Sequence, residues 1–278
     1  MNGDFRLGVL GVGHMGQALA RGVVARGAVP PDRVTVADPD EEACAKLAAD
    51  LGVRVARDNA ELVAQSDVVL LCVKPQILFD VIAPVAEGFG PGRLVISVAA
   101  GVTLAALEGA LPGRTPVVRA MPNTPCLVGA GMSAWARGHS ATAEHGVVTQ
   151  SILGAVGVAR EVREDALDAV TAVSGSGPAY VFHLMEAMME GGVKAGLDPA
   201  VVREFVLQTV LGAAQLALAS DTDPGELRRR VMSPGGTTEA AVRTLDDAGF
   251  QTAVVRAMGA ARDRSVEMAR AFHQARRP

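Results

Sequence analysis

Two glycine-rich stretches hold the residues that could do chemistry in this sequence. The first, GVGHMG, has the spacing G-x-G-x-x-G at Gly11, Gly13 and Gly16, and the second, SPGGTT, covers Ser233 to Thr238. Each stretch places small residues directly before a helical pattern, where unpaired backbone N–H groups and the helix dipole favour an anion. The sequence therefore predicts two anion-binding loops, more than two hundred residues apart.

The first stretch has the context that a dinucleotide-binding loop requires, because it follows a strand pattern and opens a helical one. Gly11 would permit the tight turn, Gly13 would let the backbone approach a pyrophosphate, and Gly16 would allow close packing of helix on strand. Asp38 lies 22 positions after Gly16, where an acid usually bonds the ribose 2′-hydroxyl. A carboxylate there repels a 2′-phosphate and favours NADH over NADPH, although the nearby Arg57 leaves the choice open.

The second stretch predicts a loop that holds a small anion with backbone N–H groups and hydroxyls. Pro234 would stiffen the entry, and Gly235 and Gly236 would let a ligand come close. Thr237 and Thr238 would add hydroxyl donors at the helix start. An ordinary Ser or Thr N-cap with a glycine turn is the alternative that the residue types alone leave open.

Three further motifs could contribute to a site. Lys74 in CVKPQ follows a buried-type strand, where it could bind cofactor phosphates, a substrate carboxylate or only water. Asn123 in MPNTP could bond a nicotinamide amide or hold the turn before Pro125. SGSGPAY, residues 174–180, could shape the floor of the site through Ser176, or it could be a capped helix start.

The elements that must position these residues fall into two groups. Up to about residue 160, short β-branched strands alternate with helical stretches, which indicates βαβ units and a parallel sheet. Beyond that point strand patterns stop and helices follow, the last two over about 237–248 and 251–275. We therefore expect an α/β domain over residues 1–163 and an all-helical domain over residues 164–278.

Composition argues against several other classes of protein. The formal net charge of −4 and an aromatic content of 3% do not favour a nucleic-acid partner. No run approaches the ~18 apolar residues of a membrane span, and no secretory pattern opens the chain, so we expect a cytoplasmic protein without a membrane partner. Cys44, Cys72 and Cys126 are far apart and suit packed thiols in a reducing compartment. No spacing of His, Cys, Asp or Glu suggests a metal site.

Six motifs together resemble the pyrroline-5-carboxylate reductases over nearly the whole length of the chain. They are GVGHMGQAL, DVVLLCVKPQ, ISVAAGVT, RAMPNTP, AVSGSGPAY and VMSPGGTTEAAVRTLD. The resemblance implies a Rossmann-type domain, then a helical domain that binds substrate and interlocks with a partner subunit as a dimer or higher ring. It also implies reduction of a cyclic imine to L-proline with NADH or NADPH.

The resemblance also implies the residues of the site. Cofactor contacts would come from Gly11, Val12, Gly13, His14, Met15, Gly16, Asp38, Asn59, Cys72, Val73, Lys74, Pro75, Val98, Ala99 and Ala100. Substrate contacts would come from Glu164, Ser233, Gly236, Thr237 and Thr238, to which the loop reasoning adds Gly235. Three positions depart from the family pattern: His14 replaces a frequent Asn or Gln, Asp38 replaces a small polar residue, and Arg230 replaces an expected Asn.

The expected mechanism follows from the substrate, which offers a carboxylate and a C=N bond. The loop around Ser233 would hold the carboxylate while hydride passes from C4 of the nicotinamide to the imine carbon. The ring nitrogen must be protonated, and Thr238 is the residue expected to bond that nitrogen or relay its proton. Because a threonine hydroxyl is a weak acid, water or prior protonation in solution could supply the proton instead.

Two other functions fit part of the sequence. A β-hydroxyacid dehydrogenase would also use GVGHMG, but it usually needs a lysine one turn after an asparagine in the helical domain. Lys194 is the only lysine in that half, and no asparagine precedes it on its helix. A non-catalytic NAD-binding redox sensor would keep the glycine loop but would have no use for the second anion loop.

Overall fold

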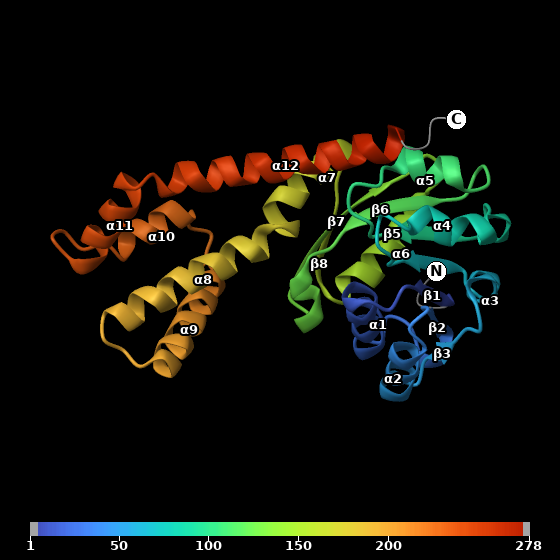
Figure 1. Ribbon diagram of the computed structural model, residues 1–278, viewed down its shortest axis with the longest axis horizontal. Coiled ribbons are helices and arrows are strands. Elements are labelled where there is room, and N and C mark those ends of the chain that lie inside the picture. Colours follow the sequence, from blue (N-terminus) through green and yellow to red (C-terminus); the bar gives the residue numbers. More distant parts are fainter. Residues whose placement is uncertain (1–4, 275–278) are drawn as a thin grey trace. The chain divides into compact units, whose positions relative to one another are not determined.

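The structure, a computed structural model, describes residues 5–274 and the side chains as far as residue 271. The outermost residues of the two predicted domains, and the last predicted helical residue, lie outside the described residues. The chain divides into two compact units (Figure 1). Unit 1 contains the residues up to Ser176 together with those from Ala261 onward, and unit 2 is Gly177–Ala260.

Unit 1 is built on one eight-stranded sheet of order β3-β2-β1-β4-β5-β6-β7-β8. β1 pairs in parallel with both β2 and β4, so the strand order reverses beside β1. The first six strands follow the Rossmann order, in which ligands bind where the order reverses, at the carboxyl ends of the strands. The strands are β1 (Leu7–Leu10), β2 (Val34–Ala37), β3 (Arg54–Val55), β4 (Val68–Leu71), β5 (Leu94–Ser97), β6 (Val117–Met121), β7 (Gly131–Arg137) and β8 (Gly157–Glu161).

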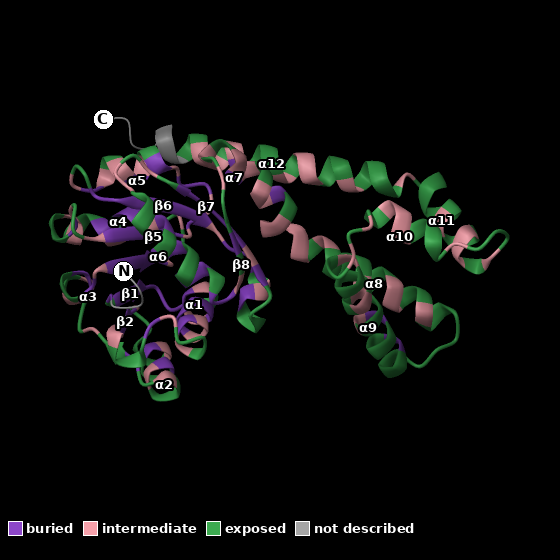
Figure 2. Cartoon of the chain, turned by 180° about the vertical axis from the view of Figure 1, so that it is seen from behind, coloured by how far each residue is buried: buried purple, intermediate pink, exposed green. Residues whose placement is uncertain are grey.

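The central strands of the sheet, β1, β2, β4, β5 and β6, are buried on both faces, as the purple strands of Figure 2 show. Successive residues of β4 alternate between two hydrophobic clusters: Val68 and Leu70 join one, and Val69 and Leu71 join the other. A strand covered on both sides reads as an unbroken apolar run, which explains the sequence VVLL. The connecting helices are α1 (His14–Ala25), α2 (Glu41–Leu51), α3 (Asn59–Gln65), α4 (Leu78–Ile82), α5 (Leu104–Ala110) and α6 (Ala143–Gly154).

One pair of strands departs from the expected parallel sheet. β7 runs antiparallel to β6, while β8 runs parallel to β7 after the crossover through α6. The connection from β6 to β7 is a single 3-10 turn, Thr124–Val128, that ends at Gly129 with φ of 71°. Such a short connection can only reverse the chain, because a parallel crossover needs a dozen or more residues.

SGSGPAY leads into a long helix, with Pro178 at its second position, but the preceding helical turns run almost directly into it. α7 (Leu167–Val170) continues through a π turn (Thr171–Gly175) almost directly into α8 (Gly177–Lys194). Pro178 has no N–H to give to the carbonyl of Ser174, one turn earlier. That carbonyl instead accepts a hydrogen bond from Asn123 Nδ2 at 3.0 Å.

Unit 2 is helical, as predicted, and no strand is assigned among the described residues after Glu161. Asp198 caps the second long helix by accepting from the N–H of Ala200, with Pro199 at its first position. Gly192 lets α8 and this helix approach, because a Cβ there would lie 2.8 Å from the side chain of Val202. The remaining elements are α9 (Pro199–Leu218), α10 (Pro224–Arg230), α11 (Thr237–Asp247) and α12 (Phe250–Gln274), whose residues from Ala261 belong to unit 1.

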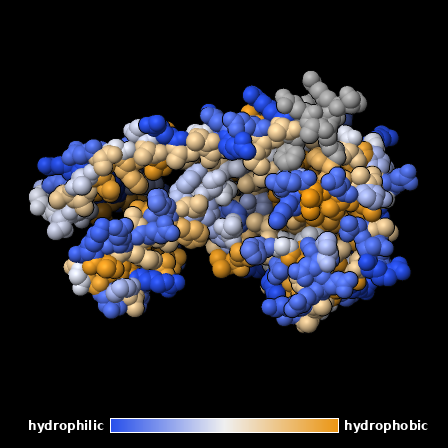
Figure 3. All heavy atoms as spheres, in the orientation of Figure 1, coloured by the Kyte–Doolittle hydropathy of each residue, from blue (hydrophilic) through white to orange (hydrophobic). Residues whose placement is uncertain are grey.

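Unit 2 exposes most of its large apolar side chains, and Figure 3 shows hydrophobic residues on the surface of α8 and α9. Only Val202 and Val206 are buried among the apolar residues of this fully described unit. Phe205, Leu211 and Leu216 on α9 are each more than half exposed. By length and composition α9 is one helix among the described residues that could cross a membrane, although Arg203 and Glu204 interrupt its apolar run. An apolar surface of this extent in one chain indicates a surface that another protein or a membrane covers.

Candidate functional site

In the glycine loop between β1 and α1, contacts within the protein itself require glycine at two positions. Gly11 has φ of 99°, and its N–H donates to the carbonyl of Ala37 at 2.8 Å. A Cβ on Gly16 would lie 1.9 Å from the carbonyl oxygen of Gly11, so α1 rests directly on the turn. Both positions therefore need glycine whether or not a ligand is bound.

Gly13 is different, because no described residue lies where its side chain would be. Its φ of −63° is ordinary, and a Cβ there would meet no atom of the described part of the chain within 4 Å. Gly13 is also the N-cap of α1, which has no side-chain cap, and both Gly13 and His14 are exposed. This arrangement leaves helix N–H groups and open space together, as the approach of a pyrophosphate requires.

Asp38 links the end of β2 to the glycine loop. Its Oδ2 accepts from the N–H of Val12 at 2.8 Å, and its Oδ1 accepts from the N–H of Asp40 at 2.9 Å. A carboxylate has about four acceptor positions, so two remain for the hydroxyls of a ribose. The residues present therefore suit a dinucleotide.

A cleft of about 620 Å³ opens beside Asp38, where β2 and β3 end and α3 begins. It is lined by Asp38 and Asn59, two residues expected to contact the cofactor, and Asn59 is held at the start of α3 by the N-cap Asp58. The cleft also includes Arg57. Its full lining is Ala37, Asp38, Pro39, Glu41, Cys44, Ala45, Val55, Ala56, Arg57, Asp58 and Asn59.

The predicted strand ends of β4 and β5 are neighbours on the same edge. Cys72 donates its N–H to Leu10 on one side, and Val98 donates to Leu71 on the other. Ala99 is buried and Lys74 is exposed. Desolvation raises the pKa of the Cys72 thiol to about 12, so this side chain is a neutral packing group. Residues 72–75 and 98–100 therefore lie along the edge that carries the glycine loop.

Asn123 performs the structural role that the sequence reasoning left open. It is buried. Its Oδ1 accepts from the N–H of Met132 at 2.8 Å, and its Nδ2 donates to the carbonyl of Ser174. The amide therefore holds the turn between β6 and β7 and supplies the bond that Pro178 cannot make. One N–H of the amide remains for a cofactor. Ser176 follows the π turn and is half-buried.

Arg119 is a site-supporting residue that the sequence reasoning missed. It lies on β6, only 5% exposed, with Nη1 3.2 Å from Glu164 and Nη2 3.5 Å from Asp168. The same Glu164 oxygen accepts from the N–H of Leu104 at 2.7 Å, at the start of α5. Ser265 of α12 donates to Asp168 at 2.7 Å. A single charged residue in the otherwise apolar strand VVRAM was the sequence feature that could have revealed this network.

The SPGGTT loop lies in unit 2 and precedes α11. Gly235 has φ of 71° and donates its N–H to Glu239 at 2.6 Å, and Gly236 donates to Ser233 at 2.9 Å. α11 begins at Thr237 without a side-chain cap, so its first N–H groups are available to an anion. Unit 1 thus assembles the residues predicted for the cofactor, whereas the loop belongs to the other unit.

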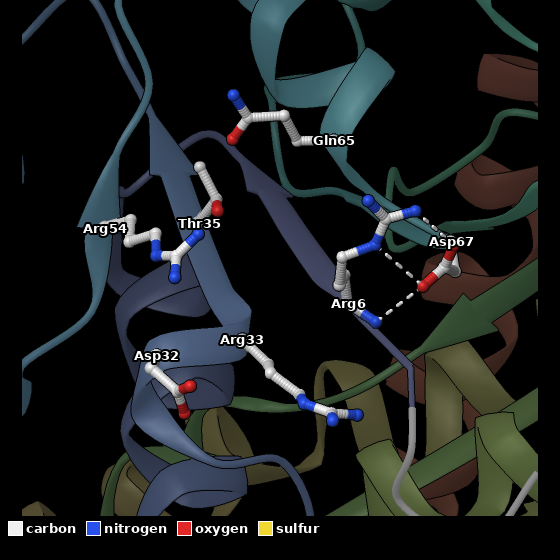
Figure 4. A pocket seen from close by; sticks show the side chains of 7 residues that line it. All are labelled: Arg6, Asp32, Arg33, Thr35, Arg54, Gln65 and Asp67. Atoms are coloured by element: carbon white, nitrogen blue, oxygen red, sulfur yellow. Dashed lines mark hydrogen bonds and ion pairs between the residues drawn. The ribbon is translucent and has the colours of Figure 1, made fainter.

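A second cleft, of about 490 Å³, lies at the opposite edge of the sheet, where the strands begin (Figure 4). There Arg6 donates to both carboxylate oxygens of Asp67, at 2.7 and 3.1 Å. Hydrogen bonding from that guanidinium keeps the pKa of Asp67 below its ordinary value. Because ligands of such sheets bind at the carboxyl ends of the strands, this cleft is not the candidate site. Over the described residues, no group of three His, Cys, Asp or Glu side chains could hold a metal ion.

Comparison with known proteins agrees with both halves of this arrangement. Residues 6–101 match the family model of NADP oxidoreductases, coenzyme F420-dependent, and residues 164–268 match that of pyrroline-5-carboxylate reductase dimerisation. The pyrroline-5-carboxylate reductase of Pseudomonas aeruginosa is 44% identical over 97% of this chain and 98% of its own length. That of Escherichia coli is 37% identical over 95% and 98%.

Solved structures give the same result. The crystal structure of the Plasmodium falciparum pyrroline carboxylate reductase with NADP bound has a TM-score of 0.88 and 29% identity, and the match covers 97% of this chain and 100% of that chain. The pyrroline-5-carboxylate reductase of Coxiella burnetii has a TM-score of 0.90 and 34% identity over 95% and 98%.

Proposed function

Because this chain belongs to the pyrroline-5-carboxylate reductase family, we propose that it binds the cofactor through the glycine loop and the Asp38–Asn59 cleft, and the substrate through residues 233–238. The protein reduces L-1-pyrroline-5-carboxylate to L-proline, the last step of proline biosynthesis, with a nicotinamide cofactor. It self-associates through its helical region. The relatives reported above favour this function over the two alternatives, a β-hydroxyacid dehydrogenase and a non-catalytic redox sensor.

The proposed cofactor site depends on one observation above all, the open space at Gly13. Gly13 leaves room for a pyrophosphate at the start of α1. Val12, His14, Met15 and Gly16 complete this loop, and residues 72–75, 98–100 and Asn123 complete the edge. When bound, the nicotinamide supplies the hydride, and the protein contributes position.

The proposed cofactor is NADH rather than NADPH. Asp38 lines the cleft with a carboxylate that is already fixed by the N–H of Val12. A fixed negative charge accepts from the ribose hydroxyls and repels a 2′-phosphate. Steady-state rates with NADH and NADPH at equal concentration test this proposal. A lower KM for NADPH than for NADH would contradict it.

The proposed substrate site is the start of α11. Ser233, Gly235, Gly236 and Thr237 would surround the carboxylate. The uncapped first N–H groups of α11 and the hydroxyls would donate to it, and the two glycines would leave room for it. Thr238 would hydrogen-bond the ring nitrogen or relay its proton. Ser176 and Glu164 are further proposed substrate contacts, although Glu164 also accepts from Arg119 and Leu104.

We propose that residues 1–163 bind the cofactor and that residues 164–278 bind the substrate and form the contacts of self-association. The dimerisation match, which begins at residue 164, supports this division. A partner subunit over α9 accounts for its exposed apolar side chains better than a membrane, because α9 lies inside that match. We place the enzyme in the cytoplasm, without a nucleic-acid or membrane partner.

The direct test of the proposed function uses two absorbance assays of the reduced cofactor. One follows its consumption with pyrroline-5-carboxylate, and the other follows its formation from oxidised cofactor with β-hydroxyacids. The imine alone should be turned over. Turnover of hydroxyacids at a comparable rate would contradict the proposal.

A further inference from the structure

Arg57 lies in the same cleft as Asp38 and Asn59, but it carries the opposite charge to Asp38. Its side chain is 84% exposed. Only its Nε and its main-chain N–H have partners within the described part of the chain, so both terminal amino groups are available as donors. Paired N–H donors of a guanidinium match the geometry of a phosphate.

Among the described residues, Glu61 is the single hydrogen-bond partner of Arg57, and it lies outside the lining of the cleft. Its Oε2 accepts from the Arg57 N–H at 2.8 Å and from Nε at 3.0 Å, and its Oε1 accepts from Gln65 at 3.1 Å. The hydrogen bond from the Arg57 main chain is the largest cause that lowers the pKa of Glu61. Glu61 therefore stays ionised at neutral pH and places a negative charge directly behind the guanidinium.

We propose that the Arg57–Glu61 pair tunes the cofactor preference of this enzyme: Arg57 offers its terminal amino groups to a 2′-phosphate, and Glu61 weakens that attraction. The inference rests on the proposed cofactor site, because it requires the adenosine ribose to lie beside Asp38. In this cleft Asp38 accepts a hydrogen bond from the 2′-hydroxyl of NADH, while Arg57 attracts the 2′-phosphate of NADPH. The charge of Glu61 determines how strong that attraction is. Glu61 thus acts on specificity from a position that does not touch the cofactor.

The size of the effect is bounded by the exposure of Arg57. Exposed ion pairs contribute little, so release of Arg57 should tighten binding of a 2′-phosphate only about two- to fivefold. Glu61→Gln is the suitable change, because the amide oxygen can still accept from the Arg57 main chain while the charge is removed.

The experiment uses two probes in calorimetric titrations of the full-length enzyme: adenosine 2′,5′-bisphosphate, and adenosine 5′-monophosphate, which lacks the 2′-phosphate. Glu61→Gln should tighten the bisphosphate about two- to fivefold and leave the monophosphate unchanged. Arg57→Gln should weaken the bisphosphate alone. In the double variant Arg57→Gln/Glu61→Gln, the increase in bisphosphate affinity caused by Glu61→Gln should be absent. Glu87→Gln, an equal charge change at an exposed acid outside the cleft lining, should change neither affinity.

Two results would overturn the inference: an equal effect of Glu61→Gln on both probes, or a gain that persists without Arg57. If Glu61→Gln does not fold, Arg57→Gln alone decides, because unchanged binding of the bisphosphate contradicts the proposal. Asp38→Ala separates this inference from the proposed function. If that change leaves the monophosphate affinity unaltered, the cofactor does not use this cleft, and the proposed cofactor site itself fails.

Discussion

The guanidinium of Arg119 on β6 lies 3.2 Å from the carboxylate of Glu164, and the same carboxylate oxygen accepts the N–H of Leu104 at the start of α5. Arg119 is buried, whereas the Glu164 side chain is 35% exposed. One carboxylate therefore neutralises a buried charge and fixes the helix start that follows the β5 strand end. This pair joins the core of the sheet to the edge proposed for the cofactor.

Replacing Arg119 by Met should lower the free energy of unfolding by roughly 2–3 kcal/mol, because Glu164 and Asp168 would lose their buried partner. The value is below that of a fully buried pair, since Glu164 retains contact with water. Urea unfolding followed by the fluorescence of Trp135 measures the change. Arg137→Met is the control, because the Arg137–Glu161 pair is exposed and should contribute less than about 1 kcal/mol. Equal losses in the two variants would contradict the role assigned to Arg119.

Alanine at Gly13 should mainly weaken cofactor binding, whereas alanine at Gly16 should mainly lower the stability of the fold. Gly13→Ala places its methyl group in open space, so the melting temperature should fall only slightly, through the poorer N-cap, while the KM for the reduced cofactor rises at least tenfold, about 1.4 kcal/mol. Gly16→Ala forces a Cβ against the Gly11 carbonyl, so the protein itself should lose stability. Thermal melts without cofactor and steady-state kinetics distinguish the two. If Gly13→Ala lowers the melting temperature as much as Gly16→Ala, Gly13 serves the fold rather than the cofactor.

Thr238→Val should lower kcat/KM at least tenfold, about 1.4 kcal/mol, because it removes the hydroxyl proposed to bond the ring nitrogen. Thr244→Val on the same helix is the control, since the Thr244 hydroxyl donates to the carbonyl of Ala240 within α11. That variant should retain the parent kcat/KM. Normal turnover by Thr238→Val would exclude a hydroxyl at this position from the reaction.

The Cys72 thiol should make the protein less stable at high pH. The folded-state pKa of about 12 lies above the ordinary value of 9.0, so the unfolded chain loses this proton first as pH rises. The contribution of Cys72 to stability is therefore complete below 9.0 and falls between 9.0 and about 12. Urea unfolding of the parent and of Cys72→Ala across this range should show a steeper decline in the parent. Parallel declines would contradict the desolvation of this thiol.

Phe205→Glu should weaken self-association, because Phe205 presents an apolar ring that is 57% exposed in the single chain. A buried, unpaired carboxylate in an interface costs several kcal/mol. Analytical ultracentrifugation should show a shift toward monomer. Gln208→Glu adds the same charge to an exposed polar position of α9 and should shift the equilibrium less. An unchanged oligomer in Phe205→Glu would place the interface elsewhere.

Much of the fold and of the candidate site was predictable from the sequence because these features depend on neighbours along the chain. The positive φ of Gly11, the proline-initiated start of α9 at Asp198–Pro199, and the unbroken apolar run of β4 each reflect a local backbone or burial requirement. Asp38 was also predictable, because its distance along the chain from the glycine loop is a property of the βαβ unit. Alternation of strands and helices therefore predicted the dinucleotide half and the helical half.

Tertiary structure alone decided which groups satisfy buried polar atoms. No local pattern says that Asn123 must bond the Ser174 carbonyl or that Arg119 must meet Glu164. The physical reason is that backbone conformation is determined within a few residues, whereas a buried donor or acceptor must be paired by whatever group the folded chain brings to it.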